Sequence, residues 1–297
     1  MFRGSFALFA ITLMTLGGSN WADGSAPEAG SKIVFQSNRT GRWQIYLMNA
    51  DGSGVTALTN SSGENRAPAV SPDGRIAFIS TRDGRDQIYL MHADGSQATR
   101  LTATEGRKTA VAFSPHGHRV IFTAEYVRNY PEIYLMAVEG SNPNPLTLPP
   151  TAVFYARFSP DGDKIVFSCG RHASGTPIVL NVHTMNVDGS ELTTLTSAPG
   201  TNTSPVFRPD GRQIAFVSSR GGNLQIYAMN QDGSNVTRLT NLPGGCRSPA
   251  FSADGRRIVS ACLYHGGFQI HLMNADGSAM TRLTGPPGEN EAPAFSP

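Results

Sequence analysis

A repeat of about 44 residues runs from residue 31 to residue 297 and most constrains how this chain can fold. Three short markers keep that spacing. The first, Asp-Gly-Ser or a variant of it, begins at Asp51, Asp94, Glu139, Asp188, Asp232 and Asp276, and a Leu-Thr pair follows each. The third, Ser-Pro-Asp-Gly in its best form, has its second residue at Pro72, Pro115, Pro160, Pro209, Ala253 and Pro297. Markers that share one period indicate a tandem array of one structural unit.

Each repeat predicts four short strands. Residues 204–207, 214–218, 225–229 and 235–240 are β-branched or aromatic runs, separated by a Pro-Asp-Gly turn, a glycine-containing loop and an Asp-Gly-Ser turn. Proline presets φ at the first turn position, and glycine takes the position that needs a positive φ. The second and third strands are apolar on both faces, which is typical of strands buried on both sides. We therefore predict an all-β chain.

Four antiparallel strands in a repeat of about 44 residues are typical of a β-propeller blade. Five units are complete. The unit at 31–59 lacks its first strand, and the segment at 291–297 is only a first strand. The two pieces together make one more blade, which closes the ring and leaves no unpaired edge. We predict one domain, 31–297, that is a six-bladed β-propeller whose C-terminal strand completes the N-terminal blade.

The N-terminus resembles a secretory signal peptide. Arg3 precedes an uninterrupted apolar stretch, Phe6–Leu16, which is too short to span a bilayer, and small residues follow up to Ala22. We expect residues 1–22 to be removed, with Ser19 as the alternative cleavage site, and 23–30 to form a short segment before the propeller. A buried apolar helix is the other interpretation. The expected location is the periplasm or the secreted fraction.

The repeat motifs resemble those of a known family. Ser-Pro-Asp-Gly-x-x-Ile-Ala-Phe, Ser-x-Arg-x-Gly, Gln-Ile-Tyr-x-Met and Thr-Arg-Leu-Thr are similar to the repeats of TolB-type, WD40-like propellers over 31–297. The resemblance implies a periplasmic protein of the Tol–Pal envelope system whose propeller binds a peptidoglycan-associated lipoprotein. TolB carries an α/β domain before its propeller, and we expect this chain to lack it. Similar repeats also occur in unrelated propellers, so they specify architecture better than role.

Charge and motif content favour a binding protein over other classes. Lys+Arg 24 nearly balances Asp+Glu 22, which argues against a nucleic-acid or polybasic membrane partner. The chain contains no Gly-x-Ser-x-Gly, His-Glu-x-x-His or Cys-x-x-Cys motif, and its histidines are scattered over the repeats. We expect no catalytic residues, metal or cofactor, no membrane span in the mature chain, and a monomer that binds a protein. A carbohydrate- or lactone-processing enzyme that uses the channel mouth, and a ligand-binding sensor, stay open as alternatives.

Two repeated positions are candidates for the binding surface. One lies at the mouth of each innermost strand and holds Asn65, Lys108, Asn202 and Asn290. Such amides can line a hydrated axial channel or cap strand ends through the local backbone. The other follows the second strand and holds Arg39, Arg82 and Arg220. These arginines can form a cationic ring for a carboxylate-bearing partner, although a structural link between neighbouring blades is the favoured interpretation.

Two neighbouring repeats depart from the pattern together. They carry Tyr126, Arg128, Tyr130, Phe154, Tyr155 and Arg171 in segments that we place on the face of the variable loops. Exposed aromatic side chains with arginine are typical of protein interfaces, so we expect this set to bind the partner. The alternative is that the longer loops bury their own aromatic side chains.

The cysteines predict one bond. If a three-residue turn joins the first two strands of the repeat, Cys246 lies directly opposite Cys262. An exported protein tends to oxidise such a pair. We expect a Cys246–Cys262 disulfide that leaves Cys169 outside the bond.

Overall fold

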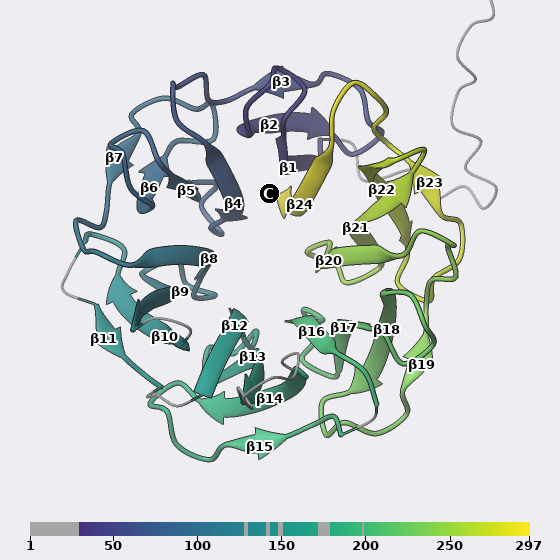
Figure 1. Cartoon of the computed structure of the whole chain (residues 1–297). Coiled ribbons are helices and arrows are strands. Elements are labelled where there is room, and N and C mark those ends of the chain that lie inside the picture. The colour runs from purple at the N-terminus through teal and green to yellow at the C-terminus, as the bar shows by residue number, and fades with distance from the viewer. Residues whose placement is uncertain (1–29, 128–129, 141–142, 148–150, 172–178, 198) are drawn as a thin grey trace, which may run out of the picture.

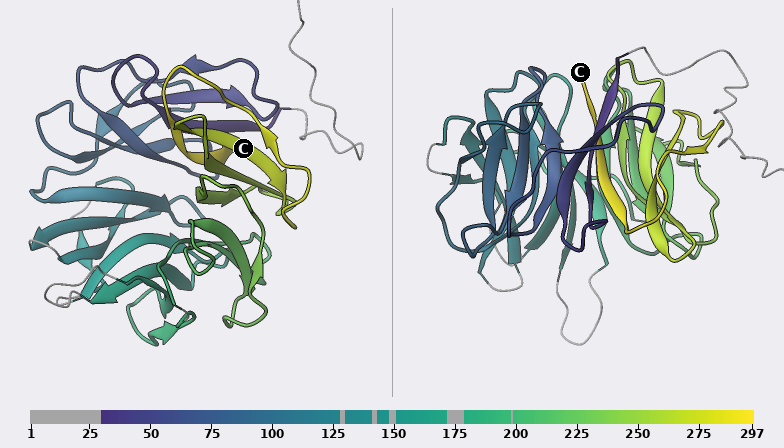
Figure 2. Two further views of the ribbon diagram at one scale, coloured as in Figure 1. Left: turned by 45° about the vertical axis from the view of Figure 1, so that its right-hand side comes forward. Right: turned by 90° about the horizontal axis from the view of Figure 1, so that it is seen from above.

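The computed structural model describes residues 30–127, 130–140, 143–147, 151–171, 179–197 and 199–297. The predicted signal peptide, 1–22, and Arg128 lie outside the described residues. Over the described ranges the chain forms six four-stranded sheets arranged in a ring (Figure 1). Seen from the side, the ring is a disc whose innermost strands run roughly along its axis (Figure 2). The predicted all-β, six-bladed propeller is confirmed.

The strands fall into four concentric sets. The innermost strands are β24 (Asn290–Ser296), β4 (Asn65–Val70), β8 (Arg107–Phe113), β12 (Thr151–Phe158), β16 (Asn202–Phe207) and β20 (Cys246–Phe251). The second strands are β1 (Lys32–Ser37), β5 (Ile76–Ser80), β9 (Arg119–Val127), β13 (Lys164–Arg171), β17 (Gln213–Ser218) and β21 (Arg257–Tyr264). The third strands are β2 (Gln44–Asn49), β6 (Gln87–Met91), β10 (Tyr130–Ala137), β14 (Asn181–Asn186), β18 (Gln225–Asn230) and β22 (Gly267–Asn274). The outermost are β3 (Thr56–Ala57), β7 (Thr99–Arg100), β11 (Asn144–Pro145), β15 (Thr193–Thr194), β19 (Thr237–Arg238) and β23 (Thr281–Arg282).

We number the blades 1 to 6 in the order of their second strands, β1, β5, β9, β13, β17 and β21. Blade 1 has the strand order β24-β1-β2-β3, so the last strand of the chain pairs with the first. The pairing is antiparallel, with Phe295 opposite Ile33 and Asn290 opposite Ser37. The predicted closure by the C-terminal strand is therefore present, and it gives β1 a partner on its inner side.

The core lies between neighbouring blades. Every residue of β5 is buried, as expected for a strand covered on both faces. An aromatic pair recurs between the second and third strands, for example Phe78 and Tyr89, whose ring centroids are 5.8 Å apart. In blade 4 His183 takes the tyrosine position and stacks on Phe167 at the same distance, 5.8 Å. That histidine therefore replaces a core aromatic residue.

Most innermost strands contain a β-bulge that the sequence patterns do not predict. At the bulge the residues Ala67, Tyr155, Ser204, Ser248 and Ala292 have φ between 47° and 55°. Blade 3 shifts its register between Lys108 and Ala110. A bulge puts two residues opposite one and re-aims the side chains that follow it. The bulges thus decide which side chains face the propeller axis.

No helix in the described part of the chain has the length and apolar character needed to cross a membrane.

Candidate functional site

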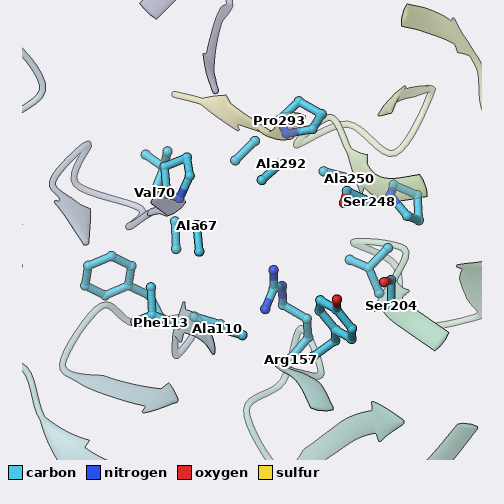
Figure 3. A pocket seen from close by; sticks show the side chains of 18 of the residues that line it. Ala67, Val70, Ala110, Phe113, Arg157, Ser204, Ser248, Ala250, Ala292 and Pro293 are labelled. Carbon is cyan, nitrogen blue, oxygen red and sulfur yellow. The ribbon is translucent and has the colours of Figure 1, made fainter. Parts of the chain in front are cut away.

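The innermost strands surround an axial channel with two connected cavities. The narrow cavity has a volume of about 220 Å³ and is lined by residues at and after the bulges (Figure 3). The wider one, about 900 Å³, opens among the Ser-Pro-Asp-Gly turns. Both have Val70 and Phe113 in their walls, so they follow each other along the axis. We call the end with these turns the turn face, the opposite end the loop face, and the wider cavity the funnel.

Small residues line the narrow cavity in five blades. At the bulge position the other blades carry Ala67, Ala110, Ser204, Ser248 and Ala292, and two residues later they carry Ala69, Ala112, Val206, Ala250 and Ala294. Blade 4 instead carries Tyr155 and Arg157 at these two positions. Figure 3 shows the side chain of Arg157 extending into the cavity from its wall. At these two positions blade 4 therefore supplies the largest side chains and a charge that the other blades lack.

Arg157 is a half-buried cation without an acidic neighbour in the cavity wall. Its Nη1 donates a hydrogen bond to the carbonyl oxygen of Ala156 at 3.0 Å. Among the described residues, no aspartate or glutamate lines the narrow cavity. Burial lowers the pKa of Arg157, whereas the nearby Tyr155 raises it. The channel therefore holds a half-buried positive charge.

The funnel is mainly apolar. An aromatic or aliphatic residue precedes each turn and lines its wall, namely Val70, Phe113, Phe158, Phe207, Phe251 and Phe295. Prolines of the turns form the rim, and Asp254, Arg256 and Arg257 of blade 6 contribute charge on one side. A concave apolar surface with a few polar groups is the usual form of a binding site.

The asparagines predicted at the channel mouth do not line either cavity, which corrects that interpretation. Asn65, Asn202 and Asn290 are fully buried. The Nδ2 of Asn65 donates to Gln44 Oε1 of the preceding blade at 2.7 Å, and its Oδ1 accepts from Arg82 Nη2 at 3.2 Å. The amides point into the seam between two blades, because a buried amide needs partners that the apolar channel lacks.

The three arginines predicted after the second strand take part in the hydrogen bonds of these asparagines. Arg39 donates to Asn290 Oδ1 at 2.8 Å, and Arg220 donates to Asn202 Oδ1 at 3.0 Å. Asn290 in turn donates to Gln269 Oε1 of the preceding blade at 2.7 Å. The guanidinium of Arg82 also lies over the ring of Tyr89, with 4.5 Å to the centroid. We call each asparagine with its arginine and its partner in the preceding blade a seam clamp. Its bonds favour the structural interpretation of Arg39, Arg82 and Arg220 over a cationic ring.

Lys108 takes the asparagine position in blade 3 and is also absent from the channel wall. Its side chain is fully buried. Its Nζ donates to the carbonyl oxygens of Thr104, Glu105 and Gly106 at 2.7, 3.0 and 3.1 Å. Burial lowers the pKa of Lys108 to about 8, while the charges of Asp86 and Glu105 raise it. The ammonium closes a turn of the connecting loop in place of a seam clamp.

The predicted aromatic interface is not assembled on the loop face. Tyr126 folds into its own blade, where its hydroxyl donates to Thr104 Oγ1 at 2.6 Å and its ring meets Tyr134 edge-on at 4.9 Å. Tyr155 faces the channel because the bulge turns it toward the axis. Phe154 and Tyr130 are half-buried. Arg128 and the side chain of Arg171 lie outside the described residues.

Cys246 and Cys262 occupy the seam-clamp position of blade 6. They are direct cross-strand partners, as expected from the turn length, and their sulfur atoms are bonded. Cys169 lies outside this bond. The disulfide takes the place of the Asn–Ser pair that blade 2 has at Asn65 and Ser80.

The described residues do not assemble a metal centre. Within them, no group of three His, Cys, Asp or Glu side chains lies close enough to hold a metal ion. His271 is buried, with its Nδ1 3.0 Å from the carbonyl oxygen of Gln269. The most unusual chemistry in the described part of the chain is therefore the Tyr155–Arg157 pair. Comparing the repeats reveals these residues as departures from Ala, Ser or Val, although that comparison does not show that they face the channel.

Comparisons with known proteins point to one family. The family model described as the TolB beta propeller domain matches residues 56–179 and 151–242. A protein named Protein TolB homolog, from Chlorobaculum tepidum, is 53% identical over 45 residues, which are 15% of this chain and 10% of that protein. The aligned segment thus spans about a tenth of the relative's length.

Two solved structures share the fold over most of the chain. TolB from Acinetobacter baumannii superposes with a TM-score of 0.77 and 25% identity, over 90% of this chain and 67% of that one. A putative TolB from Agrobacterium tumefaciens gives a TM-score of 0.68 and 24% identity, over 88% of this chain and 91% of that one.

Proposed function

Because the chain belongs to the TolB β-propeller family, we propose that it is a protein-interaction module of the cell envelope. It is exported to the periplasm, in keeping with the signal-like sequence at 1–22. Its partner is a peptidoglycan-associated lipoprotein, as the resemblance to TolB implies. The module has no catalytic role of its own, because binding alone accounts for the groups that the channel presents.

The observation that supports this function is the apolar funnel on the turn face. Val70, Phe251 and Phe295 are only half-buried there, and prolines of the turns surround them. Interface cores are depleted in charge and enriched in aromatic side chains. The funnel has that composition in a concave surface, whereas on the loop face Tyr126 is folded into its own blade. We therefore assign partner binding to the funnel.

Titration calorimetry of the whole chain with the purified, soluble part of the lipoprotein from the same organism tests this function. The informative variant is Ala253→Arg, which puts a charge at an exposed position of the funnel rim. Leu224→Arg is the matched control, because it puts the same charge on an exposed residue in the loop between β17 and β18. We expect Ala253→Arg to weaken binding and Leu224→Arg to leave it unchanged.

Two results would contradict the proposal. If the wild-type chain binds no lipoprotein, the proposed partner is wrong. If Leu224→Arg weakens binding and Ala253→Arg does not, the partner is right and the funnel is not its site.

A further inference from the structure

Blade 4 breaks the symmetry of the channel by one cation. In the other five blades the position of Arg157 holds Ala69, Ala112, Val206, Ala250 and Ala294. Within the part of the chain that the structure describes, no other charged side chain lines the narrow cavity. An arginine in an otherwise neutral ring of small residues is not needed to close the ring, since five blades do without it.

The cation has unused hydrogen-bonding capacity. A guanidinium carries five N–H donors. Toward the described residues Arg157 makes one hydrogen bond, to the backbone oxygen of its neighbour Ala156. No ion pair joins Arg157 to a carboxylate among the described residues. The arginines of the seam clamps have partners of their own, because Arg39, Arg82 and Arg220 each donate a hydrogen bond to an asparagine. Burying a charge costs free energy unless an opposite charge meets it there.

The surroundings select the kind of anion. Alanine and proline side chains make up most of the wall, and the cavity offers about 220 Å³. Tyr155, which is 41% exposed, lines the same cavity two residues before Arg157 and brings a phenolic donor. A single cation with one hydroxyl matches a monoanion on an apolar stem better than a phosphate dianion, which calls for more positive charge.

We propose that Arg157, with Tyr155 beside it, binds a carboxylate group inside the channel. The guanidinium takes the carboxylate in the two-pronged manner that its planar fork permits, and the apolar wall holds the stem of the acid. Two sources share this chemistry. One is a free small organic acid, for which the inference is independent of the lipoprotein. The other is a carboxylate carried on an inserted segment of the partner, and in that case the inference rests on the proposed function.

Titration calorimetry of the whole chain with defined probes tests the site. Sodium butyrate represents a free acid, and butyramide is its neutral counterpart of the same size. The tripeptide Ala-Ala-Ala with a free C-terminus represents a peptide carboxylate, and its C-terminal amide is the control. Inorganic phosphate tests whether any anion suffices. The Arg157→Ala variant restores the residue found in four of the other blades, so we expect it to fold, and Arg212→Ala removes an exposed arginine from a turn as a control.

We expect an acid probe to bind the wild-type chain and the Arg212→Ala variant alike. We expect its affinity for Arg157→Ala to be about ten- to hundredfold weaker, because a hydrogen-bonded charge is lost. The amide probes should not bind. Binding of the peptide acid but not of butyrate identifies an inserted chain as the source, and binding of butyrate identifies a free acid.

Three outcomes would overturn the inference. An acid probe could bind the wild-type chain and Arg157→Ala with equal affinity, or phosphate could bind as tightly as the acids. The third outcome is that neither acid binds the wild-type chain. The thermal transition of Arg157→Ala without ligand verifies that the variant is folded. Lipoprotein binding measured on the same variant separates the two proposals, because the funnel can bind its partner whether or not the carboxylate site exists.

Discussion

Blades 2 and 6 solve the same structural problem with different chemistry. At the loop end of the innermost strand, blade 2 places Asn65 opposite Ser80, and Arg82 completes the clamp. At the equivalent positions blade 6 places Cys246 opposite Cys262 and joins them covalently. Both arrangements tie the first strand of the blade to the second at a point with no access to water. The position has a structural task, and several residue types can perform it.

The channel positions follow a different rule. Ala67 and Ala69 of blade 2 correspond to Tyr155 and Arg157 of blade 4, although each pair lies only a few residues along the strand from the clamp position. Substitutions at these positions change the side chains that line the cavity, but they break none of the hydrogen bonds of the seam clamp. Departures at the clamp position therefore indicate another way of tying the first two strands of a blade together, whereas departures in the channel change what the cavity can bind.

The largest expected effect comes from opening the disulfide. Replacing Cys246 and Cys262 with alanine should lower the free energy of unfolding by about 3 kcal/mol, because a loop with a sequence separation of 16 is no longer closed in the unfolded chain. Urea unfolding of the oxidised chain measures this change, with Cys169→Ala as the control. The triple variant Cys246→Asn, Cys262→Ser, Tyr264→Arg installs the blade 2 clamp and should recover part of the loss. If it recovers nothing, the two arrangements are not interchangeable.

The seam clamp should come next. Asn65→Ala removes the hydrogen bonds of a fully buried amide to Gln44 and Arg82, so the free energy of unfolding should fall by about 2 kcal/mol. Asn60→Ala, at an exposed position of the connection that leads into the same strand, is the matched control. If the two variants lose the same free energy of unfolding in urea, the hydrogen bonds of the buried amide do not stabilise the fold.

Lys108 of blade 3 should make the free energy of unfolding depend on pH. The pKa of Lys108 is about 8 in the folded chain and near 10.5 when unfolded. Between these values the unfolded chain binds more protons, so stability should rise with pH by at most about 1.4 kcal/mol per unit. Below pH 8 the lysine is protonated in both states and adds no slope. Urea unfolding from pH 7 to 10.5 measures the difference between the wild-type chain and Lys108→Met, and parallel curves would contradict the assignment.

The smallest change in stability is expected for an ion pair on the surface. Arg85 pairs with Glu105, and both side chains are mostly exposed, at 67% and 81%. Exposed ion pairs contribute little, so Arg85→Met should change the free energy of unfolding by less than about 0.5 kcal/mol. Arg82→Met, three residues earlier, removes a donor to buried Asn65 and should cost more in the same urea measurement. A reversed order would mean that the clamp arginine is not held as described.

Much of the architecture follows from the sequence by itself, because it depends on local patterns that recur. The period, the Pro-Asp-Gly turns and the apolar strands predict six blades and the closing strand, and the turn length places Cys246 opposite Cys262. The site is different. Whether Asn65 faces the channel or the seam depends on Gln44 in the preceding blade, 21 residues away. The direction of Tyr155 and Arg157 depends on a bulge with a φ of 55° at Tyr155, a conformation that non-glycine residues rarely adopt. Only the tertiary structure decided these directions, since the Asn65–Gln44 bond joins two separate blades and the bulge forms only where β12 pairs with β13.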